Sequence, residues 1–370
     1  MKELRSVPQR LSAEAAIAVG AITVAIFFTV GGAWLKDLSS LPKFIGLFVW
    51  IFGVMLWLSF RAVHHAESLA ELLGEPFGTI LLTLAVICIE VALVATVTLT
   101  GKGTPTLARD TMFAVLMVVL NGMVGVTLLT GGLRHHEQTY DLRGANAYLS
   151  VLLPLSVLGL ILPRITPSGP GGQTSRLMEI FLAIMCAGLY AVFLRIQTGR
   201  HSDYFRDPPR SDTAAAATHA EYGKVLHGIL LMAALLPVVL LSKKLAVLVD
   251  FGVSRLGAPP ALGGLVVAIL VLTPEGVAAF RAALANELQR TVNLLFGSAL
   301  STIGLTIPAV LVVHFFVGGQ LELGLEYVQI ILLALTLAMC VVHFGGSRTT
   351  VLQGVVHLML FAAYLILIFD

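Results

Sequence analysis

The chain has 370 residues, of which 57% are hydrophobic and only 12% are charged, and its formal net charge is +2. Soluble domains carry about 25% charged residues, so the composition excludes an ordinary soluble protein. The small net charge gives no indication of a nucleic-acid partner. Strand-like alternation over ten residues is absent, so the membrane-spanning segments are expected to be helices.

Eleven hydrophobic segments follow one another along the chain, each near the length of about 20 residues that crosses a bilayer as a helix. The first follows Lys2, Arg5 and Arg10 and is too long for a signal peptide, so we expect an uncleaved helix. The segments are expected at approximately 13–35, 44–62, 77–100, 111–133, 145–163, 176–196, 222–242, 260–281, 291–317, 326–344 and 351–369.

The segments after the first divide into two sets of five. Because five is odd, the second set must cross the membrane in the inverted sense, which is a recurring transporter design. The predicted fold is therefore an all-α polytopic membrane protein with eleven transmembrane helices, one extra N-terminal helix plus two inverted five-helix repeats. The distribution of Lys and Arg favours a cytoplasmic N-terminus and an outside C-terminus. The expected divisions are 1–43 (N-terminal segment with the extra helix), 44–196 (first repeat), 197–221 (polar cytoplasmic linker) and 222–370 (second repeat).

Two glutamates interrupt otherwise uncharged segments at matching places in the two repeats. Glu90 is the only charged residue in 77–100, and Glu275 is the only one in 261–280. They are half the chain length apart, and each lies twelve residues after a glycine. A carboxylate in hydrocarbon costs roughly 2.5–3.5 kcal/mol on insertion scales. A chain that accepts this cost twice is expected to use both groups.

The sequence Thr273-Pro274-Glu275-Gly276 predicts a cluster of oxygen ligands. Pro274 has no N–H, so the carbonyl of Leu270 loses its helical partner. A free carbonyl, a carboxylate and the Thr273 hydroxyl are oxygen ligands suited to a hard cation such as Ca2+ or Na+. The alternative is a proline kink whose glutamate is satisfied by a neighbouring helix.

Further polar residues give weaker candidates for the same site. Thr79 and Thr83 share one helical face with Glu90. Ser298 and Ser301 would complete a cation shell or would only allow close helix packing. Asn121, in the equivalent helix of the first repeat, carries the same two alternatives.

Histidines and cysteines give no metal or thiol site. The adjacent pairs His64-His65 and His135-His136 point to different helix faces and do not have zinc-site spacing. For the histidines near helix ends a proton relay is the alternative to a structural role: His227, His314, His343 and His357. The cysteines lie in apolar segments without a pairing pattern and are interpreted as buried hydrophobes: Cys88, Cys186 and Cys340.

Two motif regions resemble the calcium/proton exchanger branch of the cation/calcium exchanger superfamily, and are most similar to its bacterial sodium/potassium/calcium–proton antiporters. The segment from His65-Ala66 through Gly74-Glu75-Pro76-Phe77-Gly78 to Ile89-Glu90-Val91 resembles the first α-repeat, and that from Thr273 to Leu300 resembles the second. The segment 105–111 also fits bacterial members. The resemblance covers nearly the whole chain and implies a protein of a bacterial inner membrane. It implies that Glu90 and Glu275 are paired acidic residues that bind either cation or proton.

The expected function is secondary antiport of Ca2+ and/or Na+ or K+ against H+, by competition for the two glutamates. We expect cation and proton binding at Glu90, Glu275, Thr83, Leu270, Thr273, Ser298 and Ser301, with the metal ion on the two carboxylates. The expected partners are inorganic cations, protons and membrane lipid, with no cofactor and no nucleic acid. The alternative is an intramembrane enzyme that uses the paired carboxylates for acid–base or metal-assisted chemistry on a lipid.

Overall fold

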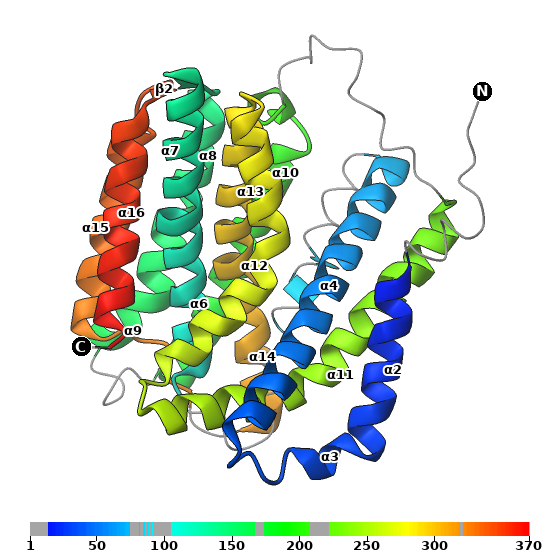
Figure 1. The fold of residues 1–370 in the computed structure, drawn as a ribbon. Helices are drawn as coiled ribbons and strands as arrows, with labels where there is room; N and C mark the ends of the chain where they lie inside the picture. The colour runs from blue at the N-terminus through cyan, green and yellow to red at the C-terminus, as the bar shows by residue number, and fades with distance from the viewer. Residues whose placement is uncertain are drawn as a thin grey trace, which may run out of the picture. The chain divides into compact units, whose positions relative to one another are not determined.

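The computed structural model describes residues 14–74, 81, 84, 85, 87, 88, 91, 105–166, 174–206, 222–318 and 321–369. The chain divides into two compact units, which are described separately. Unit 1 comprises residues 1–100 and 216–257, and unit 2 comprises residues 101–215 and 258–370. The described residues are mainly helical (Figure 1), as the sequence predicted.

Seven described helices are long and apolar enough to cross a membrane. Three shorter apolar helices accompany them: Ala15–Thr29, Tyr327–His343 and Val351–Leu367. The prediction of an all-α polytopic membrane fold is thus confirmed, while the count of eleven spans stays a prediction. The long spans are Leu41–Leu73, Leu107–His135, Leu142–Ile165, Arg176–Gln197, Lys224–Leu256, Ala261–Leu284 and Leu288–Phe316.

Unit 1 is built around two long helices that lie side by side, α4 and α11 (Figure 1). Glycine allows their close approach at one end, where a Cβ on Gly252 would lie 2.9 Å from Phe44 Cζ. The described helices of unit 1 are α2 (Ala15–Thr29), α3 (Gly31–Trp34), α4 (Leu41–Leu73) and α11 (Lys224–Leu256).

Both long helices of unit 1 continue past the ends expected from hydropathy. The predicted segments 44–62 and 222–242 stop where charged residues begin, but the helices run to Leu73 and Leu256. Each ends at a glycine with positive φ, Gly74 at 73° and Gly257 at 61°, and Gly257 has the left-handed helical conformation that commonly terminates helices. Hydropathy therefore marked the apolar part of each helix, and glycine marks its end.

Unit 2 is organised around the buried helix Leu107–His135, in which every residue from Ala108 to Met117 is buried. A helix that is surrounded on all sides is expected to be apolar around its whole circumference. The elements of unit 2 are α6 (Leu107–Met117), η1 (Val118–Met123), α7 (Val124–His135), β1 (Gln138–Thr139), α8 (Leu142–Ser156), η2 (Val157–Ile161), α9 (Leu162–Ile165), α10 (Arg176–Gln197), η4 (Ser202–Tyr204), α12 (Ala261–Leu284), α13 (Leu288–Ser301), η5 (Thr302–Thr306), α14 (Ile307–Val317), α15 (Tyr327–His343), β2 (Arg348–Thr349) and α16 (Val351–Leu367).

Close backbone contacts hold the helices of unit 2 together. Gly264 of α12 lies against the backbone of Asp110 in α6, and Gly354 of α16 lies against the backbone of Leu129 in α7. At one end of the unit, β1 and β2 form a short antiparallel pair, with Gln138 opposite Thr349. The pair joins the loop after α7 to the loop after α15.

Three π-helical segments, η1, η2 and η5, interrupt the helices of unit 2. Segments of this kind are rare and often occur at functional sites. The segment η1 contacts both α12 and α13, and η5 continues the α13 helix directly. None of the three was predicted from the sequence.

Candidate functional site

Glu275 lies in the second half of α12, which remains helical on both sides of Pro274. The residue is partly buried, and its Oε2 atom is fully buried. Pro274 and Ala279 on the same helix are also buried. A charge held away from water is costly unless it is neutralised or paired. The carboxylate is thus placed where binding of a proton or a cation has a large effect on its free energy.

The hydroxyl of Thr273 is bonded within its own helix, because Oγ1 donates to the carbonyl of Ile269 at 2.5 Å. This bond uses the hydroxyl proton and leaves oxygen lone pairs as acceptors. Leu270 is fully buried, and its carbonyl lies four residues before Pro274, which has no N–H to donate. The Thr273 hydroxyl and the Leu270 carbonyl thus each keep an oxygen lone pair that is suited to a cation.

Ser298 and Ser301 lie on α13, which packs antiparallel to α12 in a tight hairpin with the turn at 285–287. Both serines are buried, and Ser301 Oγ donates to the carbonyl of Ser298 at 3.0 Å. Thr291 Oγ1 donates to the carbonyl of Ala279 at 3.1 Å and defines the register of the hairpin.

The register of the hairpin sets the relative heights of the candidate residues. With a rise of about 1.5 Å per residue, Ser298 lies roughly 10 Å along α13 from Thr291, and Glu275 lies roughly 6 Å along α12 from Ala279. The hairpin therefore brings Ser298 to within about one helical turn of the height of Glu275. Ser301 lies about one turn farther along.

Glu90, Thr83 and Thr79 lie outside the described residues. In their segment, positions 81, 84, 85, 87, 88 and 91 are described, and they are helical. Cys88 is exposed, so its predicted burial is wrong, whereas Cys186 and Cys340 are buried as predicted. The pairing of Glu90 with Glu275 therefore stays a prediction.

Asn121 is held in a buried network on η1. Its Nδ2 donates to Thr336 Oγ1 at 2.8 Å, and its Oδ1 lies 3.2 Å from His357 Nδ1. All three residues are fully buried. Of the two alternatives for Asn121, this network favours the structural one, because the amide connects η1 to α15 and α16.

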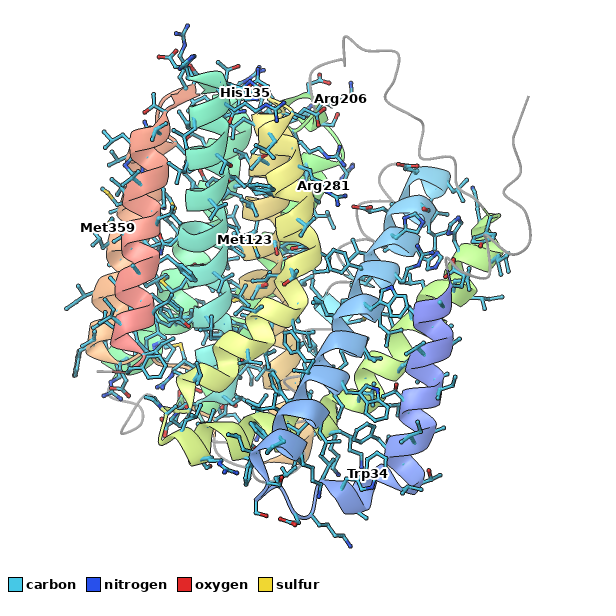
Figure 2. All side chains as sticks on the ribbon, in the orientation of Figure 1. Trp34, Met123, His135, Arg206, Arg281 and Met359 are labelled. Carbon is cyan, nitrogen blue, oxygen red and sulfur yellow. The ribbon has the colours of Figure 1, made fainter. Side chains whose placement is uncertain are left out.

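An apolar pocket of about 430 Å³ lies beside the helical stretch around Glu275. Thr273 and Gly276 contribute its α12 wall, and Met123 approaches from η1 (Figure 2). The approach is close, because a Cβ on Gly276 would lie 2.6 Å from Met123 Cε. The remaining lining residues are Val118, Gly122, Val126, Thr127, Val277, Phe280, Leu358 and Phe361.

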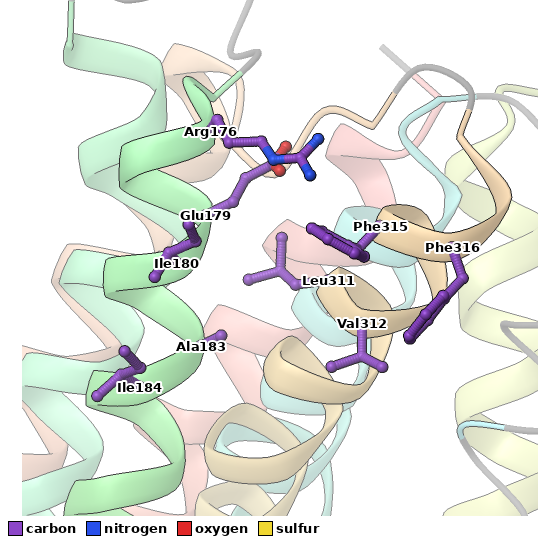
Figure 3. A pocket seen from close by; sticks show the side chains of 9 residues that line it. All are labelled: Arg176, Glu179, Ile180, Ala183, Ile184, Leu311, Val312, Phe315 and Phe316. Atoms are coloured by element: carbon purple, nitrogen blue, oxygen red, sulfur yellow. The ribbon is translucent and has the colours of Figure 1, made fainter.

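A second pocket, of about 170 Å³, lies between α10 and α14 (Figure 3). Its walls are apolar, and Arg176 and Glu179 lie at one end. The guanidinium of Arg176 lies 4.3 Å from the centre of the Phe315 ring, and Glu179 Oε1 lies 3.4 Å from His314 Nδ1. The charged groups of this pocket thus face partners within unit 2.

Polar residues at the start of α13 anchor the short η4 segment, a role that was not predicted from the sequence. Asn293 Nδ2 donates to the carbonyl of Phe205 at 2.6 Å, and Gln289 Nε2 donates to the carbonyl of Tyr204 at 3.3 Å. Gln289 Oε1 also accepts the backbone N–H of Asp141 at 2.7 Å. The signal available in the sequence was the pair of amide side chains, Gln289 and Asn293, one helical turn apart.

Within the described ranges, no group of three or more His, Cys, Asp or Glu side chains is arranged to hold a metal ion. The candidate oxygen ligands around Glu275 are instead one carboxylate, hydroxyls and a backbone carbonyl. Such a set is suited to a hard cation that binds and leaves.

Sequence comparison finds close relatives over nearly the whole chain. The profile of a family described as "Sodium/calcium exchanger protein" matches residues 43–199 and 226–369. A putative ionic transporter of Sinorhizobium fredii, y4hA, is 42% identical over 316 residues, which cover 85% of this chain and 86% of that protein. The sodium-potassium/proton antiporter ChaA of Escherichia coli is 36% identical over 335 residues, which cover 90% of this chain and 91% of that protein.

Solved structures share the fold at low sequence identity. Native YfkE superposes with a TM-score of 0.72 at 17% identity and covers 96% of this chain and 99% of its own. The H+/Ca2+ exchanger CAX superposes with a TM-score of 0.70 at 14% identity and covers 97% of this chain and 89% of its own.

Proposed function

Because the chain belongs to the sodium/calcium exchanger protein family, we propose that it is a secondary antiporter that exchanges Ca2+, Na+ or K+ for H+ at Glu90 and Glu275. The protein is a multi-pass membrane transporter of inorganic cations and not an enzyme, so the alternative of lipid chemistry at the carboxylates is set aside. Exchange in this family uses no cofactor.

The observation that carries the proposal is the buried carboxylate oxygen of Glu275 on a membrane-length apolar helix. Protonated glutamate is neutral and can be held in the membrane at low cost, whereas the carboxylate needs a cation to offset its charge. Proton and cation therefore compete for the same group. An empty, charged site is disfavoured, and the carrier changes access only when it is loaded, which enforces exchange.

Each proposed glutamate belongs to a different repeat of a proposed eleven-helix fold. One extra N-terminal helix precedes two inverted five-helix repeats, 44–196 and 222–370, joined by the cytoplasmic linker 197–221. The occurrence of η1 and η5 in corresponding helices of the two proposed repeats supports this arrangement. The proposed orientation has a cytoplasmic N-terminus and an outside C-terminus.

The remaining ligands are proposed from their oxygen chemistry. In the second repeat these are Leu270, Thr273, Ser298 and Ser301, and in the first repeat Thr83. The name of the relative ChaA supports Na+ and K+ as cations, and the family description supports Na+ and Ca2+. Each net charge moved across the membrane is worth about 2.3 kcal/mol per 100 mV, so the proton gradient can drive the exchange.

The test is proton flux in proteoliposomes with Ca2+, Na+ and K+ added in turn. Glu275→Gln and Glu90→Gln retain the side-chain volume but cannot lose a proton, so each should abolish cation-driven proton movement. Glu137→Gln is the matched control, because Glu137 is exposed and forms a surface ion pair with Arg348. Normal exchange by either well-folded site variant would rule out the mechanism.

Competition also predicts the pH dependence of transport. Raising the pH should lower the apparent cation KM, because fewer protons compete for the carboxylates. Initial rates are measured against cation concentration at several pH values. An apparent affinity that stays constant over the range would mean that proton and cation do not share a site.

A further inference from the structure

Two buried histidines meet in unit 1 although they are far apart in the sequence. His65 on α4 and His227 on α11 are both fully buried, and their Nδ1 atoms lie 3.1 Å apart. The backbone N–H of Tyr222 donates to His227 Nε2 at 3.3 Å. At the other end, His65 Nε2 lies 3.1 Å from Glu14 Oε2. The four residues thus form a continuous hydrogen-bonded chain.

The chain permits only one arrangement of protons when both rings are neutral. His227 Nε2 accepts the N–H of Tyr222, so the proton of His227 is on Nδ1. That proton is donated to His65 Nδ1, which must then be unprotonated. The proton of His65 is therefore on Nε2 and is donated to Glu14. Arg61 Nη2 lies 3.4 Å from the same atom and in this arrangement donates to Glu14 Oε1 instead. Each tautomer is determined by its neighbour.

An additional proton can bind to only one ring nitrogen if the hydrogen bond between the two rings is to be kept. Protonation of His65 Nδ1 would oppose the N–H of His227, whereas protonation of His227 Nε2 keeps the bond between the rings. The new N–H then faces the N–H of Tyr222 and displaces it. Uptake of one proton therefore breaks the hydrogen bond between Tyr222 and His227, two residues before α11 begins at Lys224.

Among the residues that the structure describes, charged and titratable groups of α2 and α4 lie next to the pair. Glu14, at the start of α2, favours a positive ring through its bond to His65. Arg61 and His64 of α4 oppose it, although Arg61 also donates to Glu14 Oε1 at 2.6 Å. The Tyr222 ring lies 5.4 Å from the His227 ring, centre to centre. The carboxylate and the guanidinium thus act in opposite directions on the charge of the ring pair.

We propose that the His65–His227 pair is a proton-binding site separate from the transport carboxylates, and that binding of one proton breaks the hydrogen bond from the backbone N–H of Tyr222 to His227. The site takes its proton from water. Its occupancy changes the bonding of Tyr222, so pH acts on unit 1 independently of cation binding.

The test is hydrogen–deuterium exchange of the peptide that contains Tyr222, measured on the full-length protein in nanodiscs between about pH 5 and 8. Rates are corrected for the intrinsic pH dependence of amide exchange. Protection of the Tyr222 amide should fall by several-fold as the pH is lowered. Both His227→Gln and His65→Gln should remove this dependence, because glutamine cannot take up the proton. His201→Gln is the matched control, since His201 stacks on Tyr204 in unit 2, and it should retain the dependence.

Glu275→Gln separates this inference from the proposed transport mechanism, because it should abolish exchange yet leave the Tyr222 titration unchanged. Protection that does not depend on pH in the wild-type protein would overturn the proposal. So would a titration that persists in both histidine variants. The wild-type measurement decides the question even where a variant does not fold.

Discussion

Gly264 allows the helix that carries Glu275 to lie directly on the buried helix at the centre of unit 2. A Cβ at this position would lie 2.9 Å from the backbone carbon and oxygen of Asp110 and from the backbone nitrogen of Thr111. These are backbone atoms within α6, so no side chain can rotate to make room. Gly264→Ala therefore requires α12 and α6 to move apart.

The expected cost of Gly264→Ala is the difference of two terms. Overpacking a close contact costs typically about 1–3 kcal/mol, and replacing a helical glycine by alanine returns about 0.5–1 kcal/mol. The net loss of stability is therefore up to about 2.5 kcal/mol, with a central value of about 1 kcal/mol. Because α12 carries Glu275, the displacement should also raise the apparent cation KM.

Gly188→Ala is the matched control, since a Cβ on Gly188 in α10 has no heavy atom within 4 Å. In Gly188→Ala only the gain from replacing a helical glycine by alanine applies, so this variant should be as stable as the wild type or slightly more stable. Thermal unfolding of both purified variants in the same detergent and at the same scan rate measures the difference. Equal midpoints for the two variants would refute the argument from close helix contact.

Three further substitutions test other contacts of unit 2 by thermal unfolding. Arg109→Met should destabilise the protein by about 3 kcal/mol, because the guanidinium is buried and bonded to the buried carboxylate of Asp110 at 2.9 Å; a loss below about 1 kcal/mol would show that the pair behaves as a surface pair. Asn121→Ala should cost about 2 kcal/mol, since it leaves buried partners unsatisfied, and an unchanged midpoint would contradict this. Arg143, bonded to Asp141, holds the pKa of that carboxyl below its usual value. The stabilisation of the folded state by ionised Asp141 is therefore present above about pH 4 and is lost as the pH falls through the lowered pKa. Asp141→Asn should slightly lower the midpoint at neutral pH, and the difference should vanish in acid; a difference that grows in acid would reverse the sign of this reasoning.

The sequence predicted the membrane helices well where one apolar run forms one helix. It placed the ends of α4 and α11 too early. Hydropathy describes which residues are stable in a membrane, whereas a helix ends where the backbone geometry changes, as at Gly74 and Gly257. The π-helical segments η1, η2 and η5 carry no composition signal. They depend on how neighbouring helices pack, which no local pattern contains.

Candidate residues were easier to identify than their partners. A lone glutamate in an apolar segment is visible because its cost is local, so Glu275 could be selected from the sequence alone. Asn121 was left between ligand and packing roles, and the choice depended on Thr336 and His357, which lie far along the chain. The His65–His227 contact was missed for the same reason, since the adjacent pairs His64-His65 and His135-His136 drew attention to local spacing.

The contacts of α12 indicate how a single carboxylate can control transport. Gly264 holds the helix against Asp110, and the Thr291 hydroxyl holds the carbonyl of Ala279, so the backbone is tied within unit 2 on both sides of Glu275. In the proposed mechanism, the backbone around the carboxylate then changes little when a proton replaces a cation. The difference between the two loaded states must therefore come mainly from the charge on Glu275. For this reason Glu275→Gln should abolish exchange, whereas Gly264→Ala should only weaken it.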